Sequence, residues 1–473
     1  MNAALLSLFA PLAGGLLLVL WRPARAGLAL GVALVSLLAA AAALHQVADG
    51  TRQWLEVGGW APPLAIRLQL TPLSALLLLF TAGLHLLVAV YAARRPHAIG
   101  GADFWPLACL LHAALAALWL SADLFNLYVT LELLGLAAVA LVALAGEKAQ
   151  RPALDYLLLS LAGSLAYLLG VAILYGRYGV LDLFLLGEQA TADAPTRLAL
   201  LLMTLGLMLK GALWPLHLWL PAAHSSAPAA VSALLSALVV KGPLYILWLL
   251  WTRLAPTELA VQAGPLLAGA GALALLAGGW AALRTPLLKS LVAYSTVAQL
   301  GYALLALGLA MHWQEPRLEA ALWLFVVAHG LAKVSMFLAA GELQHTLGGK
   351  RVVTLKGASQ TLPVTMFTFV TAGVSLIGLP PSGGFLAKWL LLQPLLERPQ
   401  HWGWALAVVL GTLMSAAYVF RVVAHGFDRA RPQPPQVRPD RFGQWLTLLP
   451  ALLVFGLALI GERMLPWLEG VSR

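Results

Sequence analysis

Residues 209–241 read LKGALWPLHLWLPAAHSSAPAAVSALLSALVVK, in the middle of a chain that is otherwise almost uniformly apolar. The stretch runs from Lys210 to Lys241, each within an apolar run, and between them it carries three prolines and two histidines: Pro215, His217, Pro221, His224 and Pro228. A charge at the centre of a membrane helix costs about 3 kcal/mol on insertion scales, so lysines buried there indicate function. A proline frees backbone groups that must face protein or water rather than lipid. Charge and helix break together predict a hydrated site at mid-membrane depth.

The composition of the whole chain is that of a membrane protein. Of 473 residues, 61% are hydrophobic and only 10% are charged, whereas a soluble protein carries about 25% charged residues. The single cysteine, Cys109, excludes a disulfide within the chain, and it excludes an iron–sulfur cluster held by the chain's own thiolates, which needs about four. The sequence contains no glycine-rich phosphate loop or dinucleotide fingerprint. We therefore expect no cofactor and no redox site in this chain.

Fourteen apolar runs are long enough to cross a bilayer, which takes about 20 residues. Two of them have a strong central break: the run at 197–220 breaks at Pro215, and the run at 363–395 breaks at GLPPSGG, residues 378–384. The broken runs are the seventh and the twelfth, an odd number apart, so the spacing predicts two inverted five-helix repeats with one broken helix each. The runs cover 3–20, 26–45, 71–93, 105–121, 123–145, 154–176, 197–220, 229–251, 262–283, 287–310, 318–341, 363–395, 402–424 and 443–461.

The expected fold class is thus an all-α polytopic membrane protein with about fourteen transmembrane helices. Four parts follow from the spacing: N-terminal helices 1–3 in residues 1–104, a first five-helix repeat in 105–251, a second, inverted repeat in 252–424, and a linker with helix 14 in 425–473. The repeat rests on spacing, because no clear residue identity relates the two halves.

Loop charges predict the orientation in the membrane. With the N-terminus outside, the cytoplasmic loops receive 15 basic residues and the outer loops 9, in agreement with the positive-inside rule. The net charge of +10 then reflects these loops rather than nucleic-acid binding. Residues 1–26 are not interpreted as a signal peptide, because their arginines follow the apolar run instead of preceding it. We expect a multi-pass protein of the cell inner membrane with both termini on the outer, periplasmic side, Trp54 and Trp60 as interface anchors, and an exposed cytoplasmic linker at 430–440.

Six ionisable side chains lie within the expected spans. They are one acid, one histidine and four lysines: Glu132, Lys210, Lys241, His329, Lys333 and Lys388. Each also has a structural explanation, since Glu132 could form an ion pair that packs helices and His329 could be a satisfied packing residue. His329 and Lys333 are four residues apart and share one helix face, which favours a polar path. Lys388 follows the second break by four residues.

Three further side chains are weaker candidates for the same path: His217, His224 and Lys289. Lys289 lies three residues after Pro286 at the cytoplasmic start of its span, where it could merely snorkel to the interface. A metal site at the two histidines is disfavoured, because no carboxylate or thiol lies close in sequence and lysine is a poor ligand. We expect no metal, and a Na⁺ site would need converging oxygens that a sequence does not locate.

The lysines suggest how a conformational step could move protons. Desolvation disfavours the charged form of a buried lysine, and a nearby carboxylate restores it. Moving the carboxylate, or its charge, therefore switches a lysine between holding and releasing a proton. Such a cycle needs hydrated cavities, and the polar side chains that could line them are Tyr128, Thr130, Ser232, Ser236, Ser295, Thr296 and Gln299.

Four motifs together resemble the antiporter-like proton-pumping subunits. That family includes the large membrane-arm subunits of respiratory complex I, membrane-bound hydrogenase subunits, and the A and D subunits of Mrp-type Na⁺/H⁺ antiporters. Residues 209–245 resemble its broken seventh helix and the following eighth, and LKSLVAYSTVAQLGY, HGLAKVSMFLAAGEL and LIGLPPSGGFLAKWLLL are similar to its tenth, eleventh and twelfth. The resemblance covers essentially the whole chain. It implies fourteen helices, two inverted five-helix repeats and a chain of protonatable residues along the middle of the membrane.

The resemblance also assigns roles residue by residue. In helix order, the matches to the family's proton-carrying positions are Glu132 in the fifth, Lys210 in the seventh, Lys241 in the eighth, His329 and Lys333 in the eleventh, and Lys388 in the twelfth. Complex I members usually have an acidic residue after WLP and continue as GPTPVSALIH. Here Ala222 and Ser236 stand at the acidic and final histidine positions, which is closer to the Mrp D-type pattern.

We therefore expect a proton-translocating subunit of a multi-subunit membrane complex, with Mrp-type cation/proton antiport favoured. Its partners would be other membrane subunits, the lipid bilayer, protons and, in an Mrp-type complex, Na⁺. The alternatives are a proton-pumping subunit of complex I or of a membrane-bound hydrogenase, or a membrane subunit of an inorganic-carbon uptake complex. A self-sufficient transporter for an organic solute is disfavoured, because groups for solute recognition are lacking. A non-conducting scaffold is disfavoured by the complete lysine series.

Overall fold

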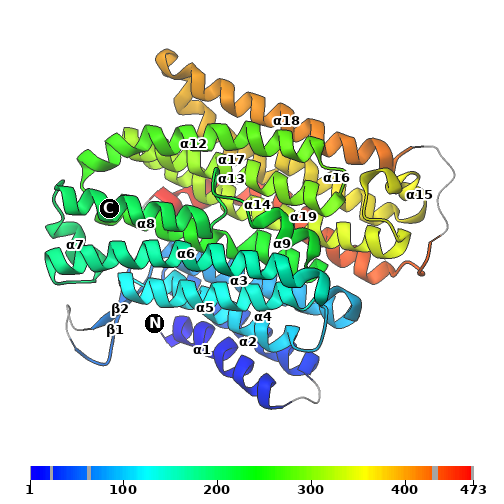
Figure 1. Cartoon of the computed structure of the whole chain (residues 1–473), viewed down its shortest axis with the longest axis horizontal. Coiled ribbons are helices and arrows are strands. Elements are labelled where there is room, and N and C mark those ends of the chain that lie inside the picture. The colour runs from blue at the N-terminus through cyan, green and yellow to red at the C-terminus, as the bar shows by residue number, and fades with distance from the viewer. Residues whose placement is uncertain (1, 22–24, 61–64, 429–434, 470–473) are drawn as a thin grey trace.

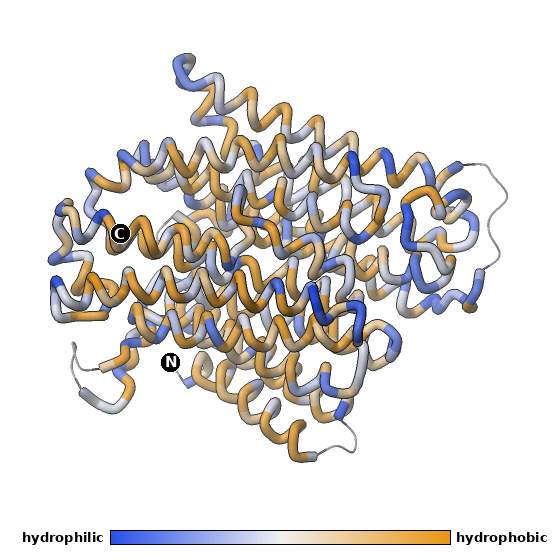
Figure 2. Tube along the Cα trace, in the orientation of Figure 1, coloured by the Kyte–Doolittle hydropathy of each residue, from blue (hydrophilic) through white to orange (hydrophobic). Residues whose placement is uncertain are grey.

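The structure is a computed structural model that describes residues 2–21, 25–60, 65–428 and 435–469. Long helices lie side by side in one bundle, with short connections at its two ends (Figure 1). We call these the hairpin end, which carries β1, β2 and the short helix α7, and the α15 end, which carries α15 (Ala358–Thr361). Figure 2 shows hydrophobic residues along the helices and hydrophilic ones gathered at both ends, as expected for a bundle that crosses a bilayer.

The N-terminal part contains three spans and a β-hairpin. The spans are α1 (Asn2–Leu20), α2 (Arg25–Gln46) and α3 (Pro72–Arg94). Strands β1 (Gln53–Val57) and β2 (Ile66–Leu70) pair antiparallel, with Leu55 opposite Leu68. Thr71 caps α3 by accepting a hydrogen bond from the backbone of Ser74, whose hydroxyl accepts one from the backbone of Thr71. This reciprocal cap satisfies two backbone donors where the hairpin meets the helix.

The next five spans contain the first break. Their elements are η1 (Pro96–Ala98), α4 (Phe104–Leu120), α5 (Leu124–Ala143), α6 (Glu147–Tyr178), α7 (Leu183–Gln189), α8 (Ala194–Lys210) and α9 (Leu220–Ser226), followed by α10 (Ala229–Leu234), η2 (Leu235–Val239), α11 (Lys241–Leu249) and η3 (Leu250–Leu254). The seventh span stops at Lys210 and resumes at Leu220, as the sequence predicts. The eighth is continuous over residues 229–254, but η2 and η3 are π-helical turns.

The following five spans contain the second break. Their elements are α12 (Thr257–Arg284), α13 (Leu288–Trp313), α14 (Pro316–Leu347), η4 (Val352–Leu355), α15 (Ala358–Thr361), α16 (Pro363–Ile377), α17 (Gly383–Leu396), η5 (Pro399–His401) and α18 (Trp402–Gly426). Helix α19 (Arg441–Glu469) follows. The twelfth span is interrupted between Ile377 and Gly383, again as predicted. Residues 430–434 of the expected linker at 430–440 lie outside the described part.

The fourteen expected spans are confirmed in the described part of the chain. Eleven helical spans are long and apolar enough to cross a membrane. The shorter α4 and the two interrupted spans complete the set. Because five crossings separate the broken spans, their first halves α8 and α16 enter the bundle from opposite ends, which is the inverted relation that the spacing predicts.

Burial divides the spans into central and peripheral ones. Nearly every residue of the most apolar window is buried in α13, α14 and the 229–254 span, against one third in α1, α2 and α18. Helix α12 packs on α13 through small residues: a Cβ on Gly271 would lie 2.6 Å from the carbonyl oxygen of Gly301. Such close approach of backbones is typical of helices packed within a membrane. The inner helices are also those that carry most of the candidate lysines.

The first helix begins and the last helix ends at the hairpin end of the bundle. The indole of Trp467, near the end of α19, donates a hydrogen bond of 3.0 Å to the carbonyl of Ala48, just before the hairpin. In Figure 1 the N-terminal end of α1 lies on the same side. The exposed side chains of Trp54 and Trp60 lie there as well, so their positions fit the expected interface anchors.

Candidate functional site

Glu132 and Lys210 form an ion pair between α5 and α8. Lys210 Nζ lies 2.7 Å from Glu132 Oε1, and the Ser164 hydroxyl on α6 hydrogen-bonds to both groups. The Lys210 side chain is 3% exposed and that of Glu132 is 22% exposed, so the pair opens onto the flank of α5. Gly163 makes room for it, since a Cβ there would lie 3.0 Å from the Lys210 side chain. Lys210 is the last residue of α8, so its charge lies at the break in the seventh span. There the Trp219 indole donates a hydrogen bond of 2.9 Å to the carbonyl of Leu209.

Lys241 and His329 meet at the centre of the bundle. Lys241 Nζ lies 2.8 Å from His329 Nδ1 and donates to the carbonyl of Ser236 at 3.0 Å. That carbonyl belongs to the π-helical turn η2, which ends two residues before Lys241. A lysine donor requires an unprotonated Nδ1, so His329 carries its proton on Nε2 in this arrangement. The Nε2 atom is buried and has no partner among the described residues.

Lys333 points to a different neighbour from His329. Its ammonium donates to the carbonyl of Val292, at 3.0 Å, and to the hydroxyl of Ser295, both on α13. The hydroxyls of Ser236 on η2 and Thr296 on α13 lie 2.9 Å apart. Within one turn of α14, His329 therefore contacts Lys241 and Lys333 contacts α13.

Lys388 bridges the second break. It is on α17, and its ammonium donates to the carbonyls of Leu376 and Ile377 at 2.8 and 3.0 Å, which are the last carbonyls of α16. A cation at a helix C-terminus is favoured by the helix dipole. The ammonium also lies 4.0 Å from the centre of the Tyr302 ring. Gly378 has φ +86°, a backbone conformation that favours glycine. A Cβ there would also lie 2.8 Å from the Lys388 side chain, so the close packing requires glycine as well.

Five buried basic groups follow one another between the two broken spans, and we call them the row: Lys210, Lys241, His329, Lys333 and Lys388. The carboxylate of Glu132 distinguishes the Lys210 end of this row from the Lys388 end. Among the described residues, Lys210 is the only lysine with a carboxylate within ion-pair distance. The three buried lysines 241, 333 and 388 are held by carbonyls, a hydroxyl and an imidazole nitrogen instead. These neutral acceptors stabilise an ammonium less than a carboxylate does. The carboxylate thus marks the Lys210 end of the row.

His224 and Lys289 lie near a cavity of about 280 Å³ at the α15 end. The Lys289 ammonium hydrogen-bonds to the carbonyl of Ala227, which terminates α9. His224 is fully buried and stacks on Phe337, with ring centres 4.6 Å apart, and neither ring nitrogen has a partner among the described residues. The cavity walls include Tyr91, His97, Ser226, Lys289, His345 and Lys350.

Two stacked imidazoles form part of that cavity wall. The rings of His97 and His345 lie 3.5 Å apart and nearly parallel. Burial, with smaller contributions from His345 and Arg95, lowers the pKa of His97 to about 4, so this ring is neutral at pH 7. His217, in contrast, lies in the partly exposed segment between α8 and α9, apart from the other candidates, and its Nδ1 atom has no partner among the described residues.

Several buried polar groups are not predicted by the sequence. His85 on α3 and His112 on α4 lie 2.9 Å apart through their Nδ1 atoms. Glu342 on α14 accepts from Arg95 at 2.6 Å and from Tyr91 at 2.8 Å. The histidines are visible as polar residues in apolar runs, but nothing in their spacing connects α3 with α4. In the described ranges, no three His, Cys, Asp or Glu side chains converge as a metal site would require.

The fold and this row of buried lysines define a class of polytopic membrane protein. Residues 121–415 match the family described as NADH:quinone oxidoreductase/Mrp antiporter, transmembrane. The chain belongs to this family.

The relatives carry two kinds of name. The chain is 36% identical to the NADH-quinone oxidoreductase subunit N of Desulforudis audaxviator, over 96% of this chain and 93% of that protein. It is 29% identical to the D-type subunit of the Na⁺/H⁺ antiporter of Bacillus subtilis, over 81% and 78%. Its fold matches a chain of the Mrp complex from Dietzia with a TM-score of 0.89 at 24% identity, covering 100% of this chain and 97% of that one.

Proposed function

We propose that the chain translocates protons across a membrane as one subunit of a multi-subunit complex. The observation that carries the proposal is the row of buried basic groups Lys210, Lys241, His329, Lys333 and Lys388, which runs from one broken span to the other and has its carboxylate, Glu132, at one end only. Charges inside a membrane protein are costly, and a row of them is typical of a proton relay.

The pair of Glu132 and Lys210 is the proposed control point. While the carboxylate is 2.7 Å away, it stabilises the charged lysine. Withdrawing Glu132 leaves that ammonium without its counter-ion, so the proton is released to the next acceptor. The partial exposure of Glu132 on the flank of α5 means that a neighbouring subunit packed there can move it.

The centre and the far end of the row follow from the contacts. Lys241 shares a hydrogen bond with His329, and Lys333 lies one turn further along α14. Lys388 sits across the second break, where movement of α17 against α16 changes its two carbonyl partners. Half-helices that meet at a site in mid-membrane are the expected moving parts of such a transporter. The proposed proton exit is near Lys388, which the resemblance matches to the proton-carrying position of the twelfth helix.

Lys289 and His224 are the proposed entry. Lys289 lines the cavity at the α15 end, and the unpartnered imidazole of His224 lies inward of it. His217 has no comparable support. We further propose that the α15 end is cytoplasmic and the hairpin end is outside, because basic loop residues concentrate at the former. The two termini then face the outer side of a cell inner membrane.

The kind of complex is a choice between two proposals. The relatives include both a D-type antiporter subunit and an oxidoreductase subunit N, so the driving process is cation exchange in one case and quinone reduction elsewhere in the complex in the other. Isolation of the tagged chain from its own membranes tests this. Co-isolation of small Mrp-type membrane subunits supports a cation-exchanging antiporter complex. Co-isolation of a redox arm supports a quinone-reducing complex. Co-isolation of hydrogenase or carbon-uptake subunits would instead assign the chain to a complex of that kind.

Transport itself is tested with the purified complex in sealed vesicles. We predict that Lys210→Ala abolishes proton flux, because the first group of the row is lost. The matched control is Lys148→Ala, since Lys148 is exposed in the first turn of α6. Equal flux in the two variants, at matched amounts of assembled complex, would refute the proposed role.

A further inference from the structure

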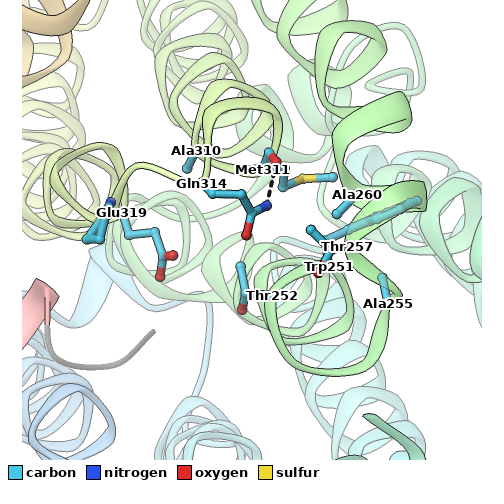
Figure 3. Close-up of a pocket in the computed structure, with 10 residues that line it drawn as sticks. Trp251, Thr252, Ala255, Thr257, Ala260, Ala310, Met311, Gln314 and Glu319 are labelled. Atoms are coloured by element: carbon cyan, nitrogen blue, oxygen red, sulfur yellow. Dashed lines mark hydrogen bonds between the residues drawn. The ribbon is translucent and has the colours of Figure 1, made fainter. Parts of the chain in front are cut away.

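A polar cavity of about 220 Å³ opens at the hairpin end, away from Lys388. It lies where η3, α12, α13 and α14 meet, and four of its lining residues carry side-chain oxygens: Thr252, Thr257, Gln314 and Glu319. Figure 3 shows these side chains around one hollow, with the Gln314 amide nitrogen turned away to donate to the carbonyl of Met311 at 2.7 Å. The amide oxygen of Gln314 is thereby left to face the cavity.

Glu319 is the acid of this cavity. It lies in the first turn of α14 and is 7% exposed, and its Oε2 accepts a hydrogen bond of 3.0 Å from the Trp248 indole. No described residue hydrogen-bonds to Oε1, the second oxygen. A buried carboxylate with a free oxygen beside a polar cavity has the chemistry to bind and release a proton.

The same two helices that hold Glu319 also hold the central pair. Trp248 is on the helix of Lys241, and Glu319 is on the helix of His329, ten residues or about 15 Å away. Between them lie three fully buried rings, Tyr245, Trp248 and Trp323, with centres 5.4–5.8 Å apart. The indole nitrogen of Trp323 has no partner among the described residues. This aromatic cluster therefore separates the cavity from Lys241 in the present state.

Arg253 places a positive charge near the Glu319 carboxylate. Its guanidinium lies 5.6 Å from the centre of the Trp248 ring, and one of its nitrogens, Nη2, is buried without a partner among the described residues. This positive charge near the Glu319 carboxylate disfavours a bound metal cation and a bound proton alike. A proton neutralises the carboxylate by bonding to it and needs no coordination shell. Arg52, which has partners of its own, adds to the positive charge near Arg253.

We propose that Glu319 exchanges protons with the hairpin-end solution and serves the central Lys241–His329 pair through a second port, which the aromatic cluster closes in this state. The inference rests on the proposed function and adds an exchange site distinct from the exit at Lys388. In the cycle, the Glu319 carboxyl gives its proton to water in the cavity when the cluster is closed. When the cluster opens, water enters and links Glu319 with His329 Nε2. The carboxylate then regains a proton from Nε2 through this water, while Nδ1 takes one from the Lys241 ammonium.

Access to the cavity is tested without reference to transport. In a Cys109→Ser background, Thr252→Cys places a single thiol in the cavity wall, and membrane-impermeant cationic and anionic thiol reagents are applied from the hairpin side. We expect labelling, and we expect Glu319→Gln to lower the ratio of cationic to anionic labelling rates about fivefold, the combined effect on the two reagents of one charge about 8 Å away in water. Glu315→Gln is the control, because Glu315 is paired with Arg398 at 3.4 Å instead of lining the cavity. An unlabelled thiol, or an unchanged ratio, overturns the inference.

Proton exchange is tested in vesicles that hold the purified complex. Glu319→Gln should reduce flux and remove its dependence on pH at the hairpin side, Glu319→Asp should retain part of both, and Glu315→Gln should match the wild type. If the wild type carries no flux, the proposed function fails, whatever the labelling shows. If the wild type conducts and Glu319→Gln conducts equally, only the second port is refuted. Protection of the Thr252→Cys thiol by Na⁺ rather than by acid would replace the proton site with a metal-cation site and overturn the inference.

Discussion

The contact between Glu132 and Lys210 joins two residues 78 positions apart in the sequence. Each alone would be an uncompensated charge, and removing one partner of a buried pair costs about 3–5 kcal/mol. Moving a proton across the potential is worth about 2.3 kcal/mol per 100 mV, so a carboxylate that approaches and leaves can supply a bias of that size. The two energies are of similar size, which suits the pair to act as a switch as well as a packing contact.

We predict that Glu132→Gln abolishes or strongly reduces proton flux and that Glu132→Asp retains part of it. The glutamine keeps the shape but cannot compensate the lysine, whereas the aspartate keeps the charge with a shorter reach. Flux in inverted membrane vesicles at matched expression is the measurement. Wild-type flux in Glu132→Gln would reduce Glu132 to a packing residue.

We predict that Lys388→Ala abolishes transport and leaves the protein inserted. Lys388→Arg should also fail, because arginine stays charged throughout the cycle. The matched control is Lys356→Ala, an exposed lysine at the α15 end. Cation-dependent or redox-driven proton flux in vesicles is compared at equal amounts of protein. Normal flux in Lys388→Arg would contradict a titrating role and leave Lys388 as a cap for the carbonyls of α16.

Residue identities could be predicted further than residue partners. Lys210, Lys241, Lys333 and Lys388 stand out in the sequence because charge within an apolar run is costly. Their acceptors do not stand out: Lys388 binds backbone carbonyls, which every residue has, and Lys241 binds a histidine 88 positions away. The resemblance assigns Glu132 and Lys210 to proton-carrying positions, but nothing in the spacing of the two residues brings α5 next to α8.

At the scale of elements, the two breaks were predictable and the π-helical turns were not. Proline and glycine announce the breaks, at residues 211–219 and 378–382. The turn η2 lies in an apolar segment without proline or glycine. A helix buried on all sides shows no hydrophobic periodicity, so the sequence does not reveal a change from α-helical to π-helical hydrogen bonding. Yet η2 supplies the carbonyl of Ser236 that Lys241 binds, so this missed feature shapes the site.

The hairpin and α7 were also missed, because both are short elements within loops. An ion pair joins them: Arg67 on β2 donates to Asp182 at 2.5 and 2.6 Å, and Asp182 also caps α7 at the backbone of Phe184 and Leu185. These elements lie beside the second port, since Gly187 of α7 packs against the Arg253 backbone.

We predict that Asp182→Ala destabilises the protein by about 3 kcal/mol, the lower end of the range for removing one partner of a buried ion pair. The loss should appear as a lower unfolding temperature of the purified protein in detergent. Glu188→Ala, at an exposed position of α7, is the control. An unfolding temperature equal to that of the wild type would mean that the hairpin end does not depend on this contact.

The organisation into repeats is a proposal at this scale. The connections nearest to the expected boundaries are residues 99–103, residues 255–256 and the segment between α18 and α19. We therefore propose N-terminal helices before the first connection, one five-helix unit before the second and another before the third. Each unit then contains one broken span and one lysine at its break.

For the whole molecule, the number of spans and the fold class were predictable from hydropathy and from the resemblance, and both are confirmed. Which spans are central was not predictable, because α13 and α14 are no more apolar than the peripheral helices α1, α2 and α18. Their centrality shows only in packing. The central helices carry His329 and Lys333, while Lys241 lies on the equally buried 229–254 span.

The central claim is that protons pass along one row through the middle of the molecule, and Lys241 is its midpoint. We predict that Lys241→Met, which keeps the length of this 1% exposed side chain and removes its charge, leaves the complex assembled and lowers proton flux to the background of empty vesicles. The measurement is proton flux by the purified complex in sealed vesicles, at equal amounts of assembled protein. Flux equal to that of the wild type would contradict the account, because protons would then cross without the central group of the row.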